Sequence, residues 1–201
     1  DLAGFGRGRG QRFRLDEAAQ ILLDWLDQLD LPAYNLMGHS MGGYIAADMA
    51  ARAGARVRRL VLVDAAGVPF QRGLLRSTLA LAESLPEVPT DFLPVLMRDA
   101  LRAGPRTLAR ASLEVLASQL GDRLAEIQSE TLIIWGEKDR LLPLEMGRRL
   151  HQALPRAQFL VIPGAGHNPM WDRPEQFNQA VLHFLQSERD RVEKSSINPT
   201  L

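Results

Sequence analysis

The sequence contains no cysteine, carries no net charge and has no long apolar run. Without cysteine the chain cannot form a disulfide, a thiolate zinc site or a cysteine nucleophile. Its 24 basic and 24 acidic side chains leave no electrostatic signature of nucleic acid or an anionic membrane as a partner. No apolar run approaches the roughly 18 residues of a membrane span. The composition is otherwise that of a globular domain.

Of the 201 residues, 46% are apolar and 24% are charged, which argues against disorder. The length fits one large domain, or one domain with an insertion. The chain begins at Asp1 rather than at methionine, so an export signal would lie upstream and the sequence predicts no compartment.

Short apolar runs bounded by turn residues predict the strands. They lie at residues 34–37, 57–63, 131–135 and 158–162. The second run contains Leu60-Val-Leu-Val63, which is typical of a parallel strand buried on both faces. Helical patterns alternate with these strands. The alternation predicts an α/β fold, with a mainly parallel sheet and helices on both faces.

Apolar positions at helical spacing predict the helices. They cover residues 16–29 and 41–53, open again at Pro143, and end with a helix that reaches about Gln186. On the first helix one face carries Ala18, Leu22, Trp25, Leu26 and Leu29. Asp172 and Glu175 match a capping box at the start of the last helix.

Residues 65 to about 128 differ in character, because proline and glycine interrupt helical stretches and no strand pattern occurs. We therefore expect a partial core at 1–67, a helical lid at 68–128, the rest of the core at 129–186 and a polar tail at 187–201. The glycine-rich segment Asp1–Gly10 predicts a flexible loop with nothing to pack. Its spaced glycines lack the preceding strand that a dinucleotide-binding motif requires.

The strongest motif is Gly38-His-Ser-Met-Gly42, which matches G-x-S-x-G between a predicted strand and a predicted helix. A sharp turn there puts Ser40 in strained backbone angles and projects its hydroxyl group. Side chains at positions 38 and 42 would collide in such a turn, and Gly43 allows close packing. The helix directs its first N–H groups at the place where an oxyanion would develop. A capping serine is the plainer alternative, but the context favours a nucleophile.

A serine nucleophile needs a base, and the sequence has four histidines. His39 adjoins Ser40 and is expected to point away from its hydroxyl group, while His151 and His183 lie inside predicted helices. His167 lies in a loop directly after a predicted strand, where parallel sheets build their sites. His167 is therefore the predicted base.

The base needs a carboxylate to orient it. Asp139 follows the strand at 131–135 and is favoured, whereas Asp64 follows the strand at 57–63 and is more simply a turn residue. Both fit the chain order serine, aspartate, histidine. No ligand pair at helical spacing, such as H-E-x-x-H, is present, so neither a metal nor a cofactor is predicted.

These residues give the chain a resemblance to α/β-hydrolase-fold enzymes of the esterase, lipase and carbon–carbon hydrolase type. The matching segments are Asp1–Gly6, Gly38–Gly43, Leu60–Asp64, Leu132–Asp139 and Pro163–His167. The resemblance runs from Asp1 to about Gln186. It implies a serine hydrolase that cleaves a carboxylic ester or similar acyl bond of a small apolar substrate through an acyl-enzyme.

In this resemblance Ser40 is the nucleophile, His167 the base and Asp139 the acid, and the backbone N–H of Met41 is one of two oxyanion donors. The lid lines an apolar pocket, for which ordinary core packing is the alternative interpretation of each residue. The pocket candidates are Phe70, Phe92, Leu93, Met97, Met170 and Trp171.

The resemblance also implies that four strands and the loop with the second oxyanion donor should precede Asp1. The strand at 34–37 would then be an unprotected edge, so we expect an N-terminally truncated fragment that is poorly soluble and nearly inactive alone. The alternative functions are a carbon–carbon hydrolase of the meta-cleavage type and a catalytically inactive fragment. The expected partner is a small-molecule ester or ketone, and the pattern predicts no oligomeric state.

Overall fold

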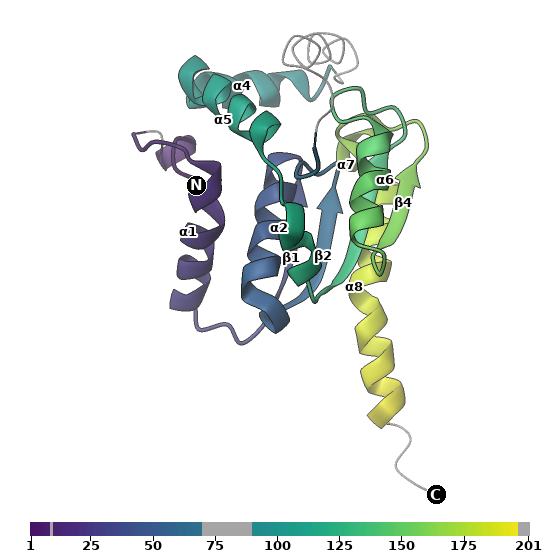
Figure 1. Cartoon of the computed structure of the whole chain (residues 1–201). Coiled ribbons are helices and arrows are strands. Elements are labelled where there is room, and N and C mark those ends of the chain that lie inside the picture. Colours follow the sequence, from purple (N-terminus) through teal and green to yellow (C-terminus); the bar gives the residue numbers. More distant parts are fainter. Residues whose placement is uncertain (9, 70–89, 197–201) are drawn as a thin grey trace, which may run out of the picture.

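The computed structural model describes residues 1–8, 10–69 and 90–196, with side-chain burial up to residue 186. Four strands form one parallel sheet in the order β1-β2-β3-β4 (Figure 1). Their bounds are β1 (Tyr34–His39), β2 (Val57–Val63), β3 (Glu130–Gly136) and β4 (Gln158–Ile162). The predicted α/β fold with a parallel sheet is therefore confirmed.

Helices cover both faces of the sheet because side chains of a strand alternate between its faces. Leu60 and Leu62 of β2 belong to one apolar cluster, and Val61 and Val63 belong to another. The helices of the first cluster include α1 (Leu15–Gln28), α2 (Met41–Ala53) and α6 (Leu144–Ala153). The second cluster packs against α8 (Pro174–Ser196). Among helices in the described ranges, none combines the length and apolarity that a membrane crossing requires.

The described part of the predicted insertion is helical. Figure 1 shows α4 (Leu93–Ala103) and α5 (Pro105–Ala117) beyond the carboxyl ends of the strands. Helix α5 is tied to α1, because the backbone N–H of Leu15 donates to Glu114 Oε2 at 2.7 Å. The remaining short helices are η1 (Gly6–Gly8), η2 (Gly54–Arg56), η4 (Gly121–Glu126) and α7 (Pro169–Asp172). The role of this segment as a lid stays a prediction.

Strand β1 lies at one edge of the described sheet, next to a broad apolar surface. Met37 of β1 is 59% exposed, and Ile21 and Trp25 of α1 are 51% and 54% exposed. These side chains border a groove of about 710 Å³ that reaches Gly38 and His39. Of the predicted apolar face of α1, Ala18 and Leu26 are buried, whereas the expectation is wrong for Trp25 and for Leu29, which is 47% exposed. The buried stripe consists of Leu15, Ala18, Ala19, Leu23 and Leu26.

Two segment ends also differ from the sequence-based expectation. Helix α8 starts at Pro174, and Asp172 instead accepts a hydrogen bond from the backbone N–H of Gly166, so the predicted capping box is wrong. The same helix continues past Gln186 to Ser196, because no proline or glycine interrupts its polar end. The opening loop does pack, since the ring of Phe5 lies edge-on against Phe13 with ring centres 5.3 Å apart.

Candidate active site

The carboxyl ends of the four parallel strands meet at one edge of the sheet, and each is followed by a polar residue. Ser40 follows β1, Asp64 follows β2, Asp139 lies in the loop after β3, and His167 in the loop after β4. The backbone hydrogen bonds between neighbouring strands continue into these turns. Ser40 N–H donates to Val63 O and Asp64 N–H donates to Ile134 O, both at 2.9 Å. The parallel register therefore brings together residues that are far apart in the sequence.

Ser40 occupies the sharp turn between β1 and α2, with φ of 54° and ψ of −119°. This strained conformation is rare for a residue with a side chain. Glycine is required at two neighbouring positions. A Cβ atom at Gly38 would clash with the carbonyl group of Gly42, and one at Gly43 would lie 2.5 Å from Ala65 Cβ. The collision predicted for position 42 is wrong, because a Cβ there would meet no atom within 4 Å.

Ser40, His167 and Asp139 lie in one hydrogen-bonded line. His167 Nδ1 is 2.7 Å from Asp139 Oδ2, and His167 Nε2 is 3.0 Å from Ser40 Oγ. An ionised carboxylate only accepts hydrogen bonds, so the imidazole proton is on Nδ1 and donates to Asp139. Nε2 is then an acceptor for the Ser40 hydroxyl proton. The arrangement can remove a proton from the serine hydroxyl group.

The loops that carry Asp139 and His167 are bonded to each other. Lys138 N–H donates to Ala165 O at 2.8 Å, and Gly164 N–H donates to Glu137 Oε2 at 2.8 Å. The two loops approach so closely that a Cβ atom at Gly136 would clash with the carbonyl group of Gly166. The second oxygen of Asp139, Oδ1, accepts from Leu142 N–H at 2.8 Å. The acid is thus held from both sides.

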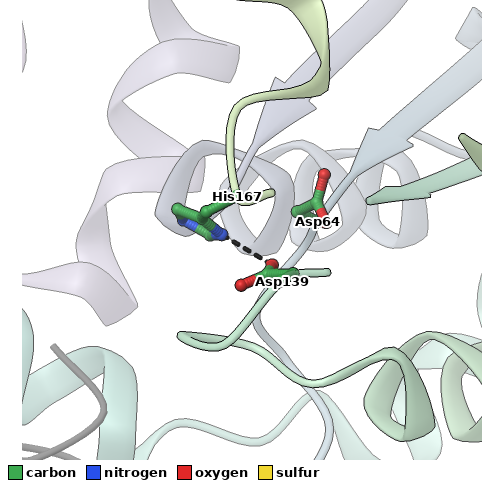
Figure 2. A group of neighbouring side chains, drawn as sticks. All are labelled: Asp64, Asp139 and His167. Atoms are coloured by element: carbon green, nitrogen blue, oxygen red, sulfur yellow. Dashed lines mark hydrogen bonds and ion pairs between the residues drawn. The ribbon is translucent and has the colours of Figure 1, made fainter. Parts of the chain in front are cut away.

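Of the two candidate acids, the structure places Asp139 against the imidazole of His167. Asp64 lies beside this pair, and Figure 2 shows the three side chains as one group. These are also the residues among those described whose donor atoms are grouped closely enough to hold a metal ion. Both imidazole nitrogens already have hydrogen-bond partners, so a metal would have to displace one of them.

No motif or spacing indicated that His39 contacts the loop of the base. Its Nε2–H donates to the carbonyl oxygen of His167 at 2.7 Å, and the two rings lie 4.8 Å apart. The side chain therefore supports the loop of His167. Burial, and secondly the nearby His167, lower the pKa of His39 to about 4. His39 is therefore a neutral donor at physiological pH.

His39 makes folding sensitive to acid. The unfolded chain binds a proton here below about pH 6.5, whereas the folded chain resists protonation down to about pH 4. The contribution of neutral His39 is present above the unfolded pKa and is lost as the pH falls through this window. We expect His39→Gln, which keeps a donor for His167 O, to lose less stability than the wild type between pH 6.5 and pH 4 in urea unfolding.

His183→Gln is the matched control for this prediction, because His183 is an exposed histidine on α8. It should follow the wild-type pH dependence. Equal acid sensitivity of His39→Gln and the wild type would contradict a neutral, buried His39.

The predicted pocket residues that the structure describes have three different surroundings. The rings of Phe92 and Trp171 lie 4.8 Å apart, and Trp171 Nε1–H donates to Asp91 at 3.2 Å. Leu93 and Met97 of α4 are 40% and 56% exposed. Met170 packs against the apolar cluster beneath α8. The candidate Phe70 lies outside the described residues. Lining of a substrate pocket by these side chains stays a prediction.

The candidate oxyanion donor is the first residue of α2. Met41 directly follows Ser40, and N–H groups in the first turn of a helix have no partner within the helix. The backbone N–H of Met41 is thus available beside the serine. The positive end of the helix dipole lies at the same point, and it favours a negative charge there.

The sequence matches the Alpha/beta hydrolase family over residues 1–180. A similar curated protein is the 2-hydroxy-6-oxononadienedioate/2-hydroxy-6-oxononatrienedioate hydrolase of Paraburkholderia phymatum. It is 34% identical over 198 residues, which cover 86% of this chain and 69% of that protein. Hydrolase 1 of the same description from Pseudomonas putida is 31% identical over 201 residues, with 86% of this chain and 70% of that protein covered.

Solved structures of two kinds resemble this fold. A thermophilic esterase from Thermogutta terrifontis has a TM-score of 0.75 and 27% identity, over 92% of this chain and 78% of that one. A meta-cleavage product hydrolase from Pseudomonas fluorescens IP01 has a TM-score of 0.73 and 27% identity, over 94% and 78%. Proteins with this architecture therefore include both an esterase and a meta-cleavage product hydrolase.

Proposed function

Because this chain belongs to the Alpha/beta hydrolase family, we propose that it is a serine hydrolase that works through an acyl-enzyme. The observation that carries the proposal is the hydrogen-bonded line from Ser40 Oγ through His167 to Asp139. In this role Ser40 is the nucleophile, His167 the general base and Asp139 the residue that orients it. The proton passes from Ser40 to His167, and Asp139 stays ionised beside the imidazole.

In the acylation step His167 Nε2 takes the proton of Ser40, and Ser40 Oγ forms a bond to the carbonyl carbon of the substrate. The negative charge moves to the carbonyl oxygen, which accepts a hydrogen bond from Met41 N–H at the start of α2. As the tetrahedral intermediate collapses, the bond to the leaving group breaks. The imidazolium of His167 then gives its proton to that group.

Deacylation repeats the sequence with water. His167 Nε2 removes a proton from water, whose oxygen attacks the acyl carbon of the ester on Ser40. The acid product leaves, and Ser40 recovers its proton from His167. Asp139 accepts from Nδ1–H in both steps, which keeps the imidazole in one tautomer and stabilises its positive charge.

We favour a carboxylic ester of a small apolar acid as the substrate. The predicted lid carries the apolar side chains of Phe92, Leu93 and Met97, which suit an apolar group. The second candidate is carbon–carbon hydrolysis of a meta-cleavage ketone. It is favoured by the names of the curated relatives, which are hydrolases of a dienedioate. The same three residues serve both reactions.

A fluorophosphonate probe tests the nucleophile, because Ser40 Oγ displaces fluoride from phosphorus and stays covalently linked. We expect one modified peptide, which contains Ser40, and none in Ser40→Ala. Hydrolysis rates of p-nitrophenyl acetate and of 2-hydroxy-6-oxononadienedioate then separate the two substrates. A folded chain that neither reacts with the probe nor hydrolyses either compound would contradict the proposal and favour the inactive alternative.

A further inference from the structure

Asp64 is a fully buried carboxyl group for which the proposed reaction has no role. Its exposed fraction is 0%, and it follows the last residue of β2 directly. Its backbone has a φ of 40°, a left-handed conformation that aspartate tolerates better than most residues. Burying a carboxyl group without a partner is costly, so this position needs a physical explanation.

One oxygen of Asp64 anchors the neighbouring strand. Asp64 Oδ1 accepts a hydrogen bond from the backbone N–H of Gly136 at 2.9 Å. Gly136 is the last residue of β3 and begins the turn that leads to Asp139. Its own N–H is therefore fixed by a side chain from the adjacent strand. This contact sets where the loop of the catalytic acid starts.

Asp64 Oδ2 is buried and unpartnered among the described residues. One oxygen each of Asp64 and Asp139 and one nitrogen of His167 all lie within 4.8 Å of one another (Figure 2). The carboxylate that orients His167 is thus a close ionisable neighbour of the buried Asp64 carboxyl group.

Two buried carboxylates at this distance cannot both be charged at low cost. Burial, and secondly the charge of Asp139, raise the pKa of Asp64 to about 10, and Asp172 of α7 acts in the same direction. Asp139 has a cationic partner whenever His167 is protonated, whereas Asp64 has none in contact in the described part of the chain. The proton therefore belongs to Asp64, on the oxygen that Gly136 leaves free.

We propose that Asp64 is a positioning residue for the acid of this site. Its carboxylic acid group anchors the loop at Gly136 and turns its O–H dipole toward the Asp139 carboxylate, so that Asp139 alone carries the charge that His167 needs. The inference rests on the proposed function. A residue that only shaped the turn after β2 would need neither a protonated carboxyl group nor an effect on the rate of the chemical step, whereas this proposal requires both.

Stability against pH gives the first test, and it needs no substrate. Between an unfolded pKa near 4 and a folded pKa of about 10, the folded chain holds one more proton than the unfolded chain. The equilibrium constant for unfolding should therefore rise about tenfold for each pH unit in this range, which means that stability falls as the pH rises. We expect Asp64→Asn to remove this slope in urea unfolding between about pH 6 and pH 9.

Asp48→Asn is the control, because Asp48 is equally buried but pairs with Arg52 and Arg123. It should keep the wild-type slope. A slope that persists unchanged in Asp64→Asn would overturn the protonated state of Asp64.

The rate of hydrolysis gives the second test. Asn can accept from Gly136 with its oxygen and present N–H groups to Asp139, so Asp64→Asn should keep kcat within about threefold of the wild type. Asp64→Ala releases the loop and should lower kcat by roughly 10–100-fold with little change in KM. Above about pH 9 wild-type kcat should decline as Asp64 ionises, and Asp64→Asn should not show this decline.

The outcomes separate the two proposals. Equal loss of kcat in Asp64→Asn and Asp64→Ala, or loss of stability alone in both, overturns the positioning role. If the slope disappears in Asp64→Asn but Ser40 does not react with the fluorophosphonate, the proposed function fails instead. Circular dichroism at neutral pH should show that each variant is folded like the wild type, so that their rates can be compared.

Discussion

Replacing Ser40 with alanine is expected to lower kcat for p-nitrophenyl acetate by about 10⁵-fold, because it removes the only atom in the relay that can bond to the acyl carbon. The Cβ atom stays, so the φ of 54° is no more strained in the variant. The serine side chain makes no helix-capping hydrogen bond, and its hydroxyl group contacts His167. Stability should therefore change by less than about 0.5 kcal/mol.

Initial rates with the purified variant, together with its urea unfolding curve, check this expectation. Ser112→Ala is a suitable control, because Ser112 is an exposed serine on α5. It should keep the wild-type rate, which excludes a general effect of removing a hydroxyl group. Turnover by Ser40→Ala close to that of the wild type would rule out Ser40 as the nucleophile.

The parts of the fold that local pattern determines could be predicted. Strands β2 and β4 have the predicted bounds, Val57–Val63 and Gln158–Ile162, because each is an apolar run between turn residues. Helix α2 also has its predicted bounds, Met41–Ala53, since Gly54 follows it with a positive φ. In these elements the residues that form the structure are adjacent in the sequence, so their pattern is sufficient.

Contacts between distant segments could not be predicted in the same way. His39 bonds to His167 across 128 residues, and Asp64 bonds to Gly136 across 72. Neither contact has a periodic or spacing signal, because each depends on how closely two loops pass at the strand ends. The exposure of Trp25 is a similar case, since the pattern of α1 does not tell which apolar side chains meet a neighbour.

The candidate site also has parts that local sequence predicts and parts that depend on contacts between distant segments. The turn around Ser40 has a local motif, and the order of serine, aspartate and histidine along the chain restricted the partners. The choice between Asp64 and Asp139 rested on strand ends alone, since both residues follow buried parallel strands. Only the distances between side chains distinguish the two residues. Their catalytic roles stay predictions, which the substitutions at both positions test.

Asp139→Asn should lower kcat by about 10⁴-fold and change KM little, because it reverses the tautomer of the base. Asp139 Oδ1 accepts from Leu142 N–H, and Oδ2 accepts from His167 Nδ1–H. In the variant the amide oxygen must remain at Leu142, since a buried N–H needs an acceptor. The amide N–H then points at His167 Nδ1, which can accept it only if its own proton moves to Nε2.

A protonated Nε2 cannot take the hydroxyl proton of Ser40, so the nucleophile is not activated although every atom keeps its place. The rate of hydrolysis and the rate of fluorophosphonate labelling should fall together, whereas thermal unfolding should change little. Asp64→Asn is the comparison that decides between the two acids, because it makes the same chemical change one strand away. A large loss in Asp64→Asn and a small one in Asp139→Asn would exchange their roles, with Asp64 as the acid that orients His167.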